Sequence, residues 1–233
     1  MKNKFIFINI AFIVLLSALT FGAAAQTATP FSGPSDNTTA PPTTTTSVGQ
    51  VLCSGSDVVL KGPADNTGTI KYQWYKLDMS GTKKLVKEGI NKYNAYTETS
   101  TGEGYYTYQL VMVNSSNCTS DPSDLFKIYV LPALNPVIAG DPTVCERNQT
   151  NSVLTITGLD SRFTYTYQWT RDGVNVAANG TTNTYTVTEQ NAGAHKYAVK
   201  VAYTLNPACT KTSADKDITV VPVPVKPVIQ FGN

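Results

Sequence analysis

The sequence predicts an all-β protein built of two tandem antiparallel β-sandwiches, and three observations carry that prediction. Short runs of alternating apolar and polar residues recur between turn signals, which is typical of strands with one buried face. No segment keeps a helical apolar period over three turns. The tripeptide Tyr-Gln-Trp occurs twice, at 72–74 and 167–169, each time inside an alternating run. Short strands separated by turns favour a sandwich.

The two tripeptides belong to a longer internal repeat. Each copy is preceded by one cysteine and followed by another, and the cysteines of the two pairs stand 65 and 64 residues apart. Lys-Ile-Tyr-Val at 127–130 returns as Asp-Ile-Thr-Val at 217–220, and Asn-Pro-Val-Ile at 135–138 returns as Lys-Pro-Val-Ile at 226–229. The domains predicted from this register are residues 48–134 and 135–225, followed by a tail, 226–233, that resembles the start of a third repeat.

The N-terminus predicts export. Residues 1–4 carry two lysines, an apolar run follows from Phe5 to Leu19, and three alanines precede Gln26. This order is that of a secretory signal peptide, here residues 1–25. A membrane anchor is the alternative, but Asn9 and Ser17 interrupt a run that is already short for a membrane span. We therefore expect a secreted or cell-surface protein with no membrane insertion after cleavage.

Residues 26–47 consist mainly of Thr, Pro, Ser, Asn and Gly and show no apolar periodicity. Such a segment buries too little surface to offset its ordering entropy, so we expect a disordered stalk, either O-glycosylated or bare. Without residues 1–25, Lys plus Arg falls from 18 to 16 against 16 Asp plus Glu. A formally neutral chain lacks the basic surface of a nucleic-acid binder.

Each expected strand follows from its own alternation or turn signal. In the first repeat the turn Asp78–Gly81 separates two strands, and Gly102–Gly104 leads into the most regular one. In the second repeat Arg171-Asp172-Gly173 predicts a hairpin, and Gly193 leads into the counterpart of that regular strand. The predicted strands are 58–60, 70–75, 85–86, 93–99, 106–112 and 126–131, then 153–156, 165–169, 174–176, 182–188, 197–203 and 218–221.

A tryptophan in mid-sheet, followed by a glycine and then a tyrosine at a strand start, resembles immunoglobulin-like domains. The resemblance implies that Trp74 and Trp169 lie in the cores and that Tyr106 and Tyr197 form tyrosine corners. The Cys-x-Gly-x-x-Val-x-Leu pattern at 53–60 and Asn-Cys-Thr-Ser at 117–120 are similar to Ig-like repeats of large secreted and surface proteins of Bacteroidota, including adhesins.

Four cysteines in an exported chain predict two disulfides, and four cysteines allow three connectivities. The repeat favours one bridge per module, Cys53–Cys118 and Cys145–Cys209. In antibody domains the second cysteine follows the corner tyrosine by two residues, whereas Cys118 follows Tyr106 by 12. Simple sandwich topology would place Cys53 and Cys118 near opposite ends of the module. Either the first strand takes an unusual path or the pairing differs.

Catalytic chemistry finds little support. His195 is the single histidine and has no nucleophile motif beside it, and the cysteines lack zinc-site spacing. Four acidic residues follow the second cysteines of the two repeats, but their spacing fits solvated loops better than a calcium loop. These are Asp121, Asp124, Asp215 and Asp217. We expect no enzyme activity, no cofactor and no metal site.

The expected function is that of a non-catalytic adhesin or spacer with an unidentified protein or glycan ligand. One alternative is a carbohydrate-binding accessory region of a secreted hydrolase, with an aromatic platform formed by tyrosines that could equally fill the sandwich. These are Tyr75, Tyr93, Tyr96 and Tyr105. The other alternative is a strand-exchanging fibre subunit that self-associates through residues 226–233. For that tail we expect continuation into a third module rather than a true terminus.

Overall fold

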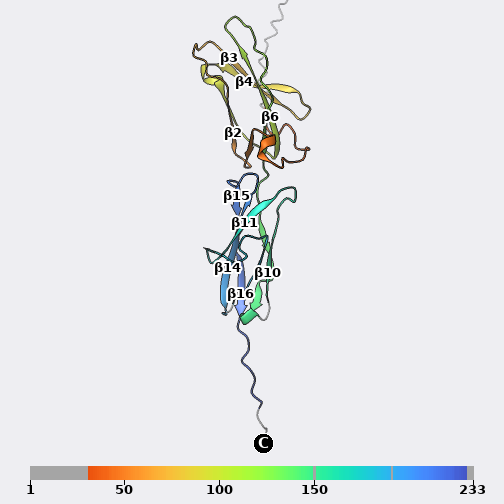
Figure 1. Cartoon of the computed structure of the whole chain (residues 1–233), viewed down its shortest axis with the longest axis vertical. Coiled ribbons are helices and arrows are strands. Elements are labelled where there is room, and N and C mark those ends of the chain that lie inside the picture. Colours follow the sequence, from red (N-terminus) through yellow and green to blue (C-terminus); the bar gives the residue numbers. More distant parts are fainter. Residues whose placement is uncertain (1–30, 149–150, 190, 230–233) are drawn as a thin grey trace, which may run out of the picture.

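The computed structural model describes residues 31–148, 151–189 and 191–229. Two β-sandwiches follow one another along the long axis of the molecule, and the C-terminal segment leaves from the far end of the second (Figure 1). The described residues contain no α-helix, only three 3₁₀ turns at Thr45–Ser47, Asn91–Asn94 and Glu146–Asn148. The predicted all-β fold class is therefore confirmed. The predicted signal peptide, residues 1–25, lies outside the described residues.

The first sandwich packs a five-stranded sheet against a two-stranded one. The larger sheet has the order β1-β7-β6-β3-β4, in which β1 runs parallel to β7 and the other pairs are antiparallel. The smaller sheet pairs β2 with β5. The strand bounds are β1 Gln50–Leu52, β2 Asp57–Lys61, β3 Lys71–Leu77, β4 Lys83–Ile90, β5 Ala95–Thr99, β6 Gly104–Val113 and β7 Phe126–Val130.

The second sandwich has the same plan with one strand more in its smaller sheet, whose order is β13-β10-β8. Its larger sheet has the order β12-β11-β14-β16-β9, and β15 pairs with β14. The strand bounds are β8 Val137–Ala139, β9 Thr143–Cys145, β10 Val153–Thr157, β11 Tyr165–Arg171, β12 Val174–Asn175, β13 Thr184–Thr186, β14 Gly193–Tyr203, β15 Thr210–Thr212 and β16 Lys216–Val221.

The repeated tryptophans lie in equivalent places in the two cores. Trp74 is 4% exposed and Trp169 is fully buried. Each indole N–H donates to a backbone carbonyl, that of Tyr93 for Trp74 and that of Thr182 for Trp169, both at 2.9 Å. Strand alternation points these side chains inward, and the hydrogen bond removes the cost of burying the indole nitrogen.

The two corner tyrosines differ in what their hydroxyls contact. Both side chains are fully buried. The Tyr106 hydroxyl donates to the carbonyl of Gly102 at 3.0 Å and accepts from the backbone N–H of Thr101 at 3.1 Å, as in a tyrosine corner. The Tyr197 hydroxyl instead donates to the carboxylate of Glu189 at 2.6 Å. The tyrosine corner implied at Tyr197 is therefore wrong, because a side chain takes the place of the backbone acceptor.

The expected disordered stalk, residues 26–47, is wrong for the part that the structure describes. Ser35 lies against the first sandwich, where its hydroxyl donates to the Leu77 carbonyl at 2.5 Å and accepts from the Thr107 N–H at 3.0 Å. Lys76 is fully buried beneath Phe31, with its ammonium 5.0 Å from the ring centroid and 3.2 Å from the carbonyl oxygen. Lys76 is also paired with Glu98 at 2.6 Å, so this segment adds contacts to a cation that already has a counter-charge. Composition does not reveal these long-range contacts.

Candidate functional site at the junction between the modules

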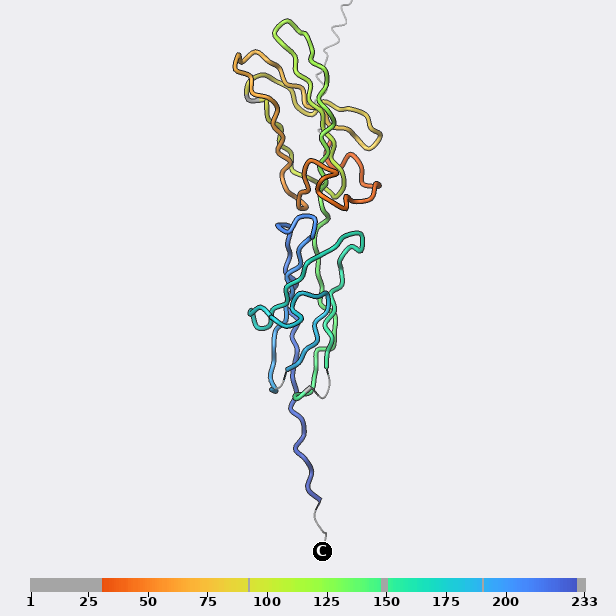
Figure 2. Tube along the Cα trace, viewed as in Figure 1, coloured from red at the N-terminus to blue at the C-terminus, as the bar shows by residue number. Residues whose placement is uncertain are grey.

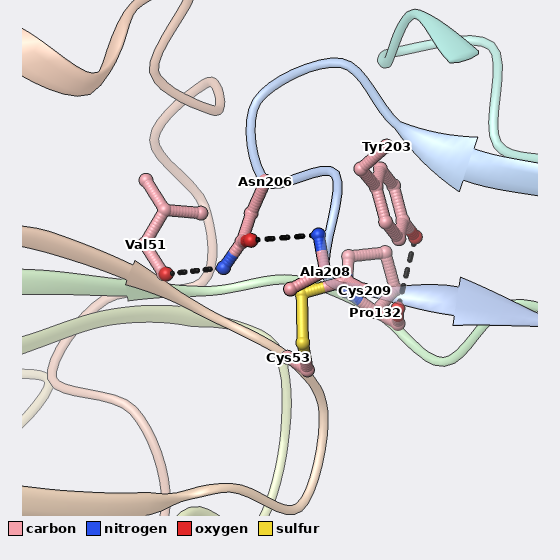
Figure 3. Close-up of a disulfide and its surroundings, with 7 residues drawn as sticks. All are labelled: Val51, Cys53, Pro132, Tyr203, Asn206, Ala208 and Cys209. Atoms are coloured by element: carbon pink, nitrogen blue, oxygen red, sulfur yellow. Dashed lines mark hydrogen bonds between the residues drawn. A yellow bond between two sulfur atoms is a disulfide. The ribbon is translucent and has the colours of Figure 1, made fainter. Parts of the chain in front are cut away.

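The two sandwiches are joined by a disulfide between Cys53 and Cys209, whose Cα atoms lie 5.3 Å apart (Figure 3). Cys53 follows β1, and Cys209 lies in the hairpin between β14 and β15. The bridge therefore connects the modules and does not staple either one internally. This corrects the expected pairings Cys53–Cys118 and Cys145–Cys209.

The path of the first strand explains why the pairing differs. β1 runs parallel to β7, so both strands end at the same end of the module. Cys53 follows β1 and therefore lies where the chain leaves β7 for the second sandwich. Cys118 lies in the connection between β6 and β7. This connection is at the opposite end of the module (Figure 2). A disulfide requires Cα atoms within about 7 Å, which these two positions do not meet. Cys118 carries a free, exposed thiol. Cys145 ends β9 and is half-buried.

Hydrogen bonds beside the bridge also cross between the modules. The side-chain amide of Asn206 donates to the carbonyl of Val51 at 2.9 Å, and its carbonyl oxygen accepts from the Ala208 N–H at 3.1 Å (Figure 3). The Tyr203 hydroxyl donates to the carbonyl of Pro132, in the connection between the sandwiches, at 2.9 Å. Two of these bonds end on backbone carbonyls, those of Val51 and Pro132, and the bond from Ala208 holds the Asn206 side chain in place.

A shared apolar cluster lies at the same place. Its buried members come from both modules and from the connection between them: Val48, Val51, Tyr129, Leu131, Phe163, Tyr203 and Cys209. Phe163 is the central contact, with ring centroids 6.3 Å from Tyr129 and 5.3 Å from Tyr203, the latter edge to face. Burial raises the pKa of the Tyr129 hydroxyl to about 12. The modules thus share one continuous apolar contact rather than a solvated hinge.

An ion pair lies at the rim of this contact. Arg162 contacts Glu103 of the first module at 2.7 Å and Asp160 of its own loop at 2.5 Å. The hydrogen bonds from Arg162 lower the pKa of Asp160. All three side chains are partly exposed, so the ion pair is worth little in stability and mainly fixes orientation. We name the disulfide, the hydrogen bonds, the apolar cluster and this ion pair together the junction.

The residues weighed for catalytic or metal chemistry in the second module lie away from the junction. His195 is on β14, and its Nδ1 lies 2.8 Å from a carboxylate oxygen of Asp172 in the hairpin before β12. Asp215 and Asp217 flank the ammonium of Lys196 at 3.9 and 3.1 Å. Over the described ranges, no three His, Cys, Asp or Glu side chains are grouped to hold a metal ion. No helix in this part of the chain is long and apolar enough to cross a membrane.

The proposed aromatic platform is not assembled. Tyr96 is buried, and its ring lies 6.2 Å from that of Trp74 in the core. Tyr105 packs edge to face on Tyr129 at 4.8 Å and donates to the carbonyl of Ala40. Two of the four candidate rings are thus engaged in packing, which removes them from any sugar-stacking surface.

Sequence reasoning missed the junction residues Phe163, Arg162 and Asn206. All three lie in loops, which carry no periodic signal, and each contacts a residue at least 30 positions away. The signal that pointed to the junction was the position of the cysteines relative to the corner tyrosines. That position excluded a bridge of the antibody type, but it did not identify Cys209 as the partner of Cys53.

The chain was compared with known proteins. No protein-family model matches it, and no curated protein does either. Among solved structures, the fibronectin(III)-like modules of Clostridium thermocellum CbhA are 15% identical over 83% of this chain and 99% of that chain, with a TM-score of 0.40. The FN1–FN3 domains of chicken CNTN1 are 14% identical over 82% of this chain and 68% of that one, with a TM-score of 0.37. At these identities and TM-scores, neither structure is a basis for assigning a ligand or an activity to this chain.

Proposed function

We propose that this protein is a secreted, non-catalytic cell-surface spacer whose two Ig-like modules are locked end to end, so that a binding surface is held away from the envelope at a fixed angle. The observation that carries the proposal is the covalent bridge between Cys53 and Cys209 across the junction. A bridge inside each module would stabilise the sandwiches and leave the hinge mobile. A bridge between them, beside a shared apolar cluster, restrains the hinge itself.

Export supports the proposal from the sequence side. Residues 1–25 have the order of a signal peptide, and disulfides persist in oxidising compartments. The resemblance to Ig-like repeats of surface proteins of Bacteroidota, including adhesins, favours the cell surface. An adhesin would present its ligand-binding surface on this rod.

The position of the bridge also gives the spacer a mechanical property. Cys53 and Cys209 are 156 residues apart, so tension applied between the two ends of the chain passes through the disulfide. The covalent path between the ends runs through the disulfide and bypasses the enclosed residues, so unfolding of those residues cannot lengthen the chain. Only the segments outside the bridge can lengthen. A spacer under flow would therefore extend much less than one without the bridge.

Single-molecule stretching tests this property. The chain from Gln26 is held by its two ends, once oxidised and once reduced. We expect the reduced chain to gain on the order of 500 Å of unfolded length, since an extended residue spans about 3.4 Å. Cys118→Ser is the matched control and should stretch like the native chain, because Cys118 forms no bridge. An oxidised chain that extends as far as the reduced one would contradict the proposal.

A further inference from the structure

An aromatic residue ahead of the first strand is held between two cations of the first module. The ring centroid of Phe31 lies 5.0 Å from the ammonium of Lys76 on β3 and 5.5 Å from that of Lys84 on β4. The carbonyl of Phe31 also accepts a hydrogen bond from the Lys76 ammonium at 3.2 Å. Two positive charges over one ring make a cation–π arrangement. We call residues 31–36, which contact β3, β4 and β6, the strap.

The strand register identifies the same place in the second module. Lys76 and Arg171 each stand two residues after a repeated tryptophan. In the ladder between β3 and β4 Lys76 lies opposite Lys84, and in the ladder between β11 and β12 Arg171 lies opposite Val174. Arg171 and Val174 therefore occupy the positions of the two cations that hold Phe31.

A pocket of about 350 Å³ lies at this place in the second module. Arg171 and Val174 line it together with Asp172, Asn175, Val176 and Tyr185. The Arg171 side chain is 47% exposed and Val174 is 70% exposed, whereas Lys76 is fully buried beneath Phe31. The pocket is thus open where the first module holds an aromatic ring.

The two modules use their leading segments differently, which explains the open pocket. The leading segment of the second module pairs with β10 as β8, and its residues, Val137–Ala139, do not line the pocket. In the first module the strap lies beside Lys76 instead, and the corresponding edge of β2 has no neighbour among the described strands. A groove of about 380 Å³ beside β2 marks that open edge. Each leading segment covers one of two places, and in the second module the place beside Arg171 stays uncovered.

The charges around the pocket favour a neutral aromatic group over an anion. Nη1 of Arg171 lies 2.7 and 3.0 Å from the two carboxylate oxygens of Glu189, and its Nε lies 3.9 Å from Asp172. Two carboxylates beside one guanidinium leave no excess positive charge for an anionic ligand. A planar guanidinium stacks on aromatic faces, and its five N–H donors also allow a bond to a carbonyl, as Lys76 makes to Phe31.

The strap itself is tied to the first module by bonds that the second module does not offer. The Ser35 hydroxyl accepts from the N–H of Thr107, which precedes the residue opposite Lys76 in β6, at 3.0 Å. The equivalent residue of β14 is Lys196, whose N–H already donates to the side chain of Asp172 at 2.8 Å. The strap of a second copy would lose these bonds on moving to the pocket, which leaves a segment of another protein as the occupant.

We propose that the pocket beside Arg171 binds an extended segment of another protein through an aromatic side chain. The ring lies between the Arg171 guanidinium and Val174, as Phe31 lies between Lys76 and Lys84, and the carbonyl of the same residue accepts from the guanidinium. The site is separate from the junction, so it does not depend on the locking of the modules or on the spacer role.

An uncharged peptide with the sequence of residues 29–35, blocked at both ends, presents Phe31 and its carbonyl as a probe. Nuclear magnetic resonance of the isotope-labelled chain from Gln26 should show saturable shifts of the N–H signals of residues 171–176 as the peptide is added. The peptide with Phe31→Ala should bind about tenfold more weakly, because it buries no ring. Shifts confined to the first module, or none at all, would overturn the proposal, as would equal binding of the two peptides.

Val174 gives a matched pair of variants, since replacement of so exposed a side chain leaves the fold intact. Val174→Lys recreates the cation of Lys84 and should tighten peptide binding by about twofold to fivefold. Val174→Asp places a carboxylate against the electron-rich face of the ring and should weaken binding by about threefold. Near-ultraviolet circular dichroism checks that both variants are folded. Equal affinities of the two folded variants would contradict the proposal.

Sedimentation velocity of the chain without peptide separates the two sources of an aromatic segment. A chain that stays monomeric supports a segment of another protein as the occupant. Self-association that Val174→Asp abolishes would make the strap of a second copy the occupant and would overturn the assignment to another protein.

Discussion

Cys53 and Cys209 are joined across the junction although 156 residues separate them. The bridge closes beside an Asn206–Val51 hydrogen bond and an edge-to-face contact between Phe163 and Tyr203. Covalent, polar and apolar contacts thus act at one place. The relative orientation of two sandwiches that are otherwise joined by a short connection is fixed by all three together.

Removal of the bridge should destabilise the junction more than either sandwich core. Cys53→Ser or Cys209→Ser is expected to lower the free energy of unfolding by about 2–5 kcal/mol, since a disulfide that closes a long loop restricts the unfolded chain. Cys118→Ser should change it by less than about 0.5 kcal/mol, because this side chain is exposed. Urea denaturation under oxidising conditions measures the difference. Equal losses for the three variants would contradict the assignment.

Truncation of Phe163 should uncouple the modules. Its ring is 7% exposed and contacts aromatic rings on both sides of the junction. Phe163→Ala is expected to cost about 3–5 kcal/mol and to split a single calorimetric transition into two. Phe126→Ala, which removes a 45% exposed ring, is the matched control and should cost well under half as much. A single unchanged transition in Phe163→Ala would show that the apolar cluster does not couple the sandwiches.

Replacement of the core tryptophans should be unequally costly. Trp169→Ala is expected to cost about 3–5 kcal/mol, because β8 closes the core over it and the cavity cannot collapse. Trp74→Ala should lie toward the lower end of that range, because Trp74 already borders the groove beside β2. Denaturant titration of the two variants gives both values. The reverse order would contradict the open edge in the first module.

The alternation, the repeat and the tryptophans were sufficient to predict an all-β tandem fold, because one-sided burial of strands leaves a period of two in the sequence. The strand expected at 93–99 begins only at Ala95, since Asn91–Asn94 forms a 3₁₀ turn.

The junction was not predicted. Its contacts link loops, such as Arg162 with Glu103, that are far apart in sequence and have no repeat counterpart. The two cysteines of each repeat are almost equally far apart, which favoured a bridge inside each module. This repeated spacing is equally compatible with a bridge between cysteines of neighbouring modules, as Cys53 and Cys209 form.

The junction should also loosen at alkaline pH. Burial raises the pKa of Tyr129 to about 12, against about 10 in the unfolded chain. A raised pKa means that this contribution to stability is complete below pH 10 and is lost as the pH rises toward 12, by at most about 1.4 kcal/mol per pH unit. Tyr129→Phe should remove one late-titrating phenol from the absorbance titration and flatten the loss of stability between pH 10 and 12. An unchanged titration curve would contradict the burial of this hydroxyl.

The central claim is that the disulfide joins the two modules, and peptide mapping without reduction tests it most directly. The oxidised chain, with its free thiols alkylated before digestion, should yield one fragment in which the Cys53 peptide is linked to the Cys209 peptide, while Cys118 carries the alkyl label. Recovery of Cys53 linked to Cys118, or of Cys209 linked to Cys145, would place the bridges inside the modules and contradict the account.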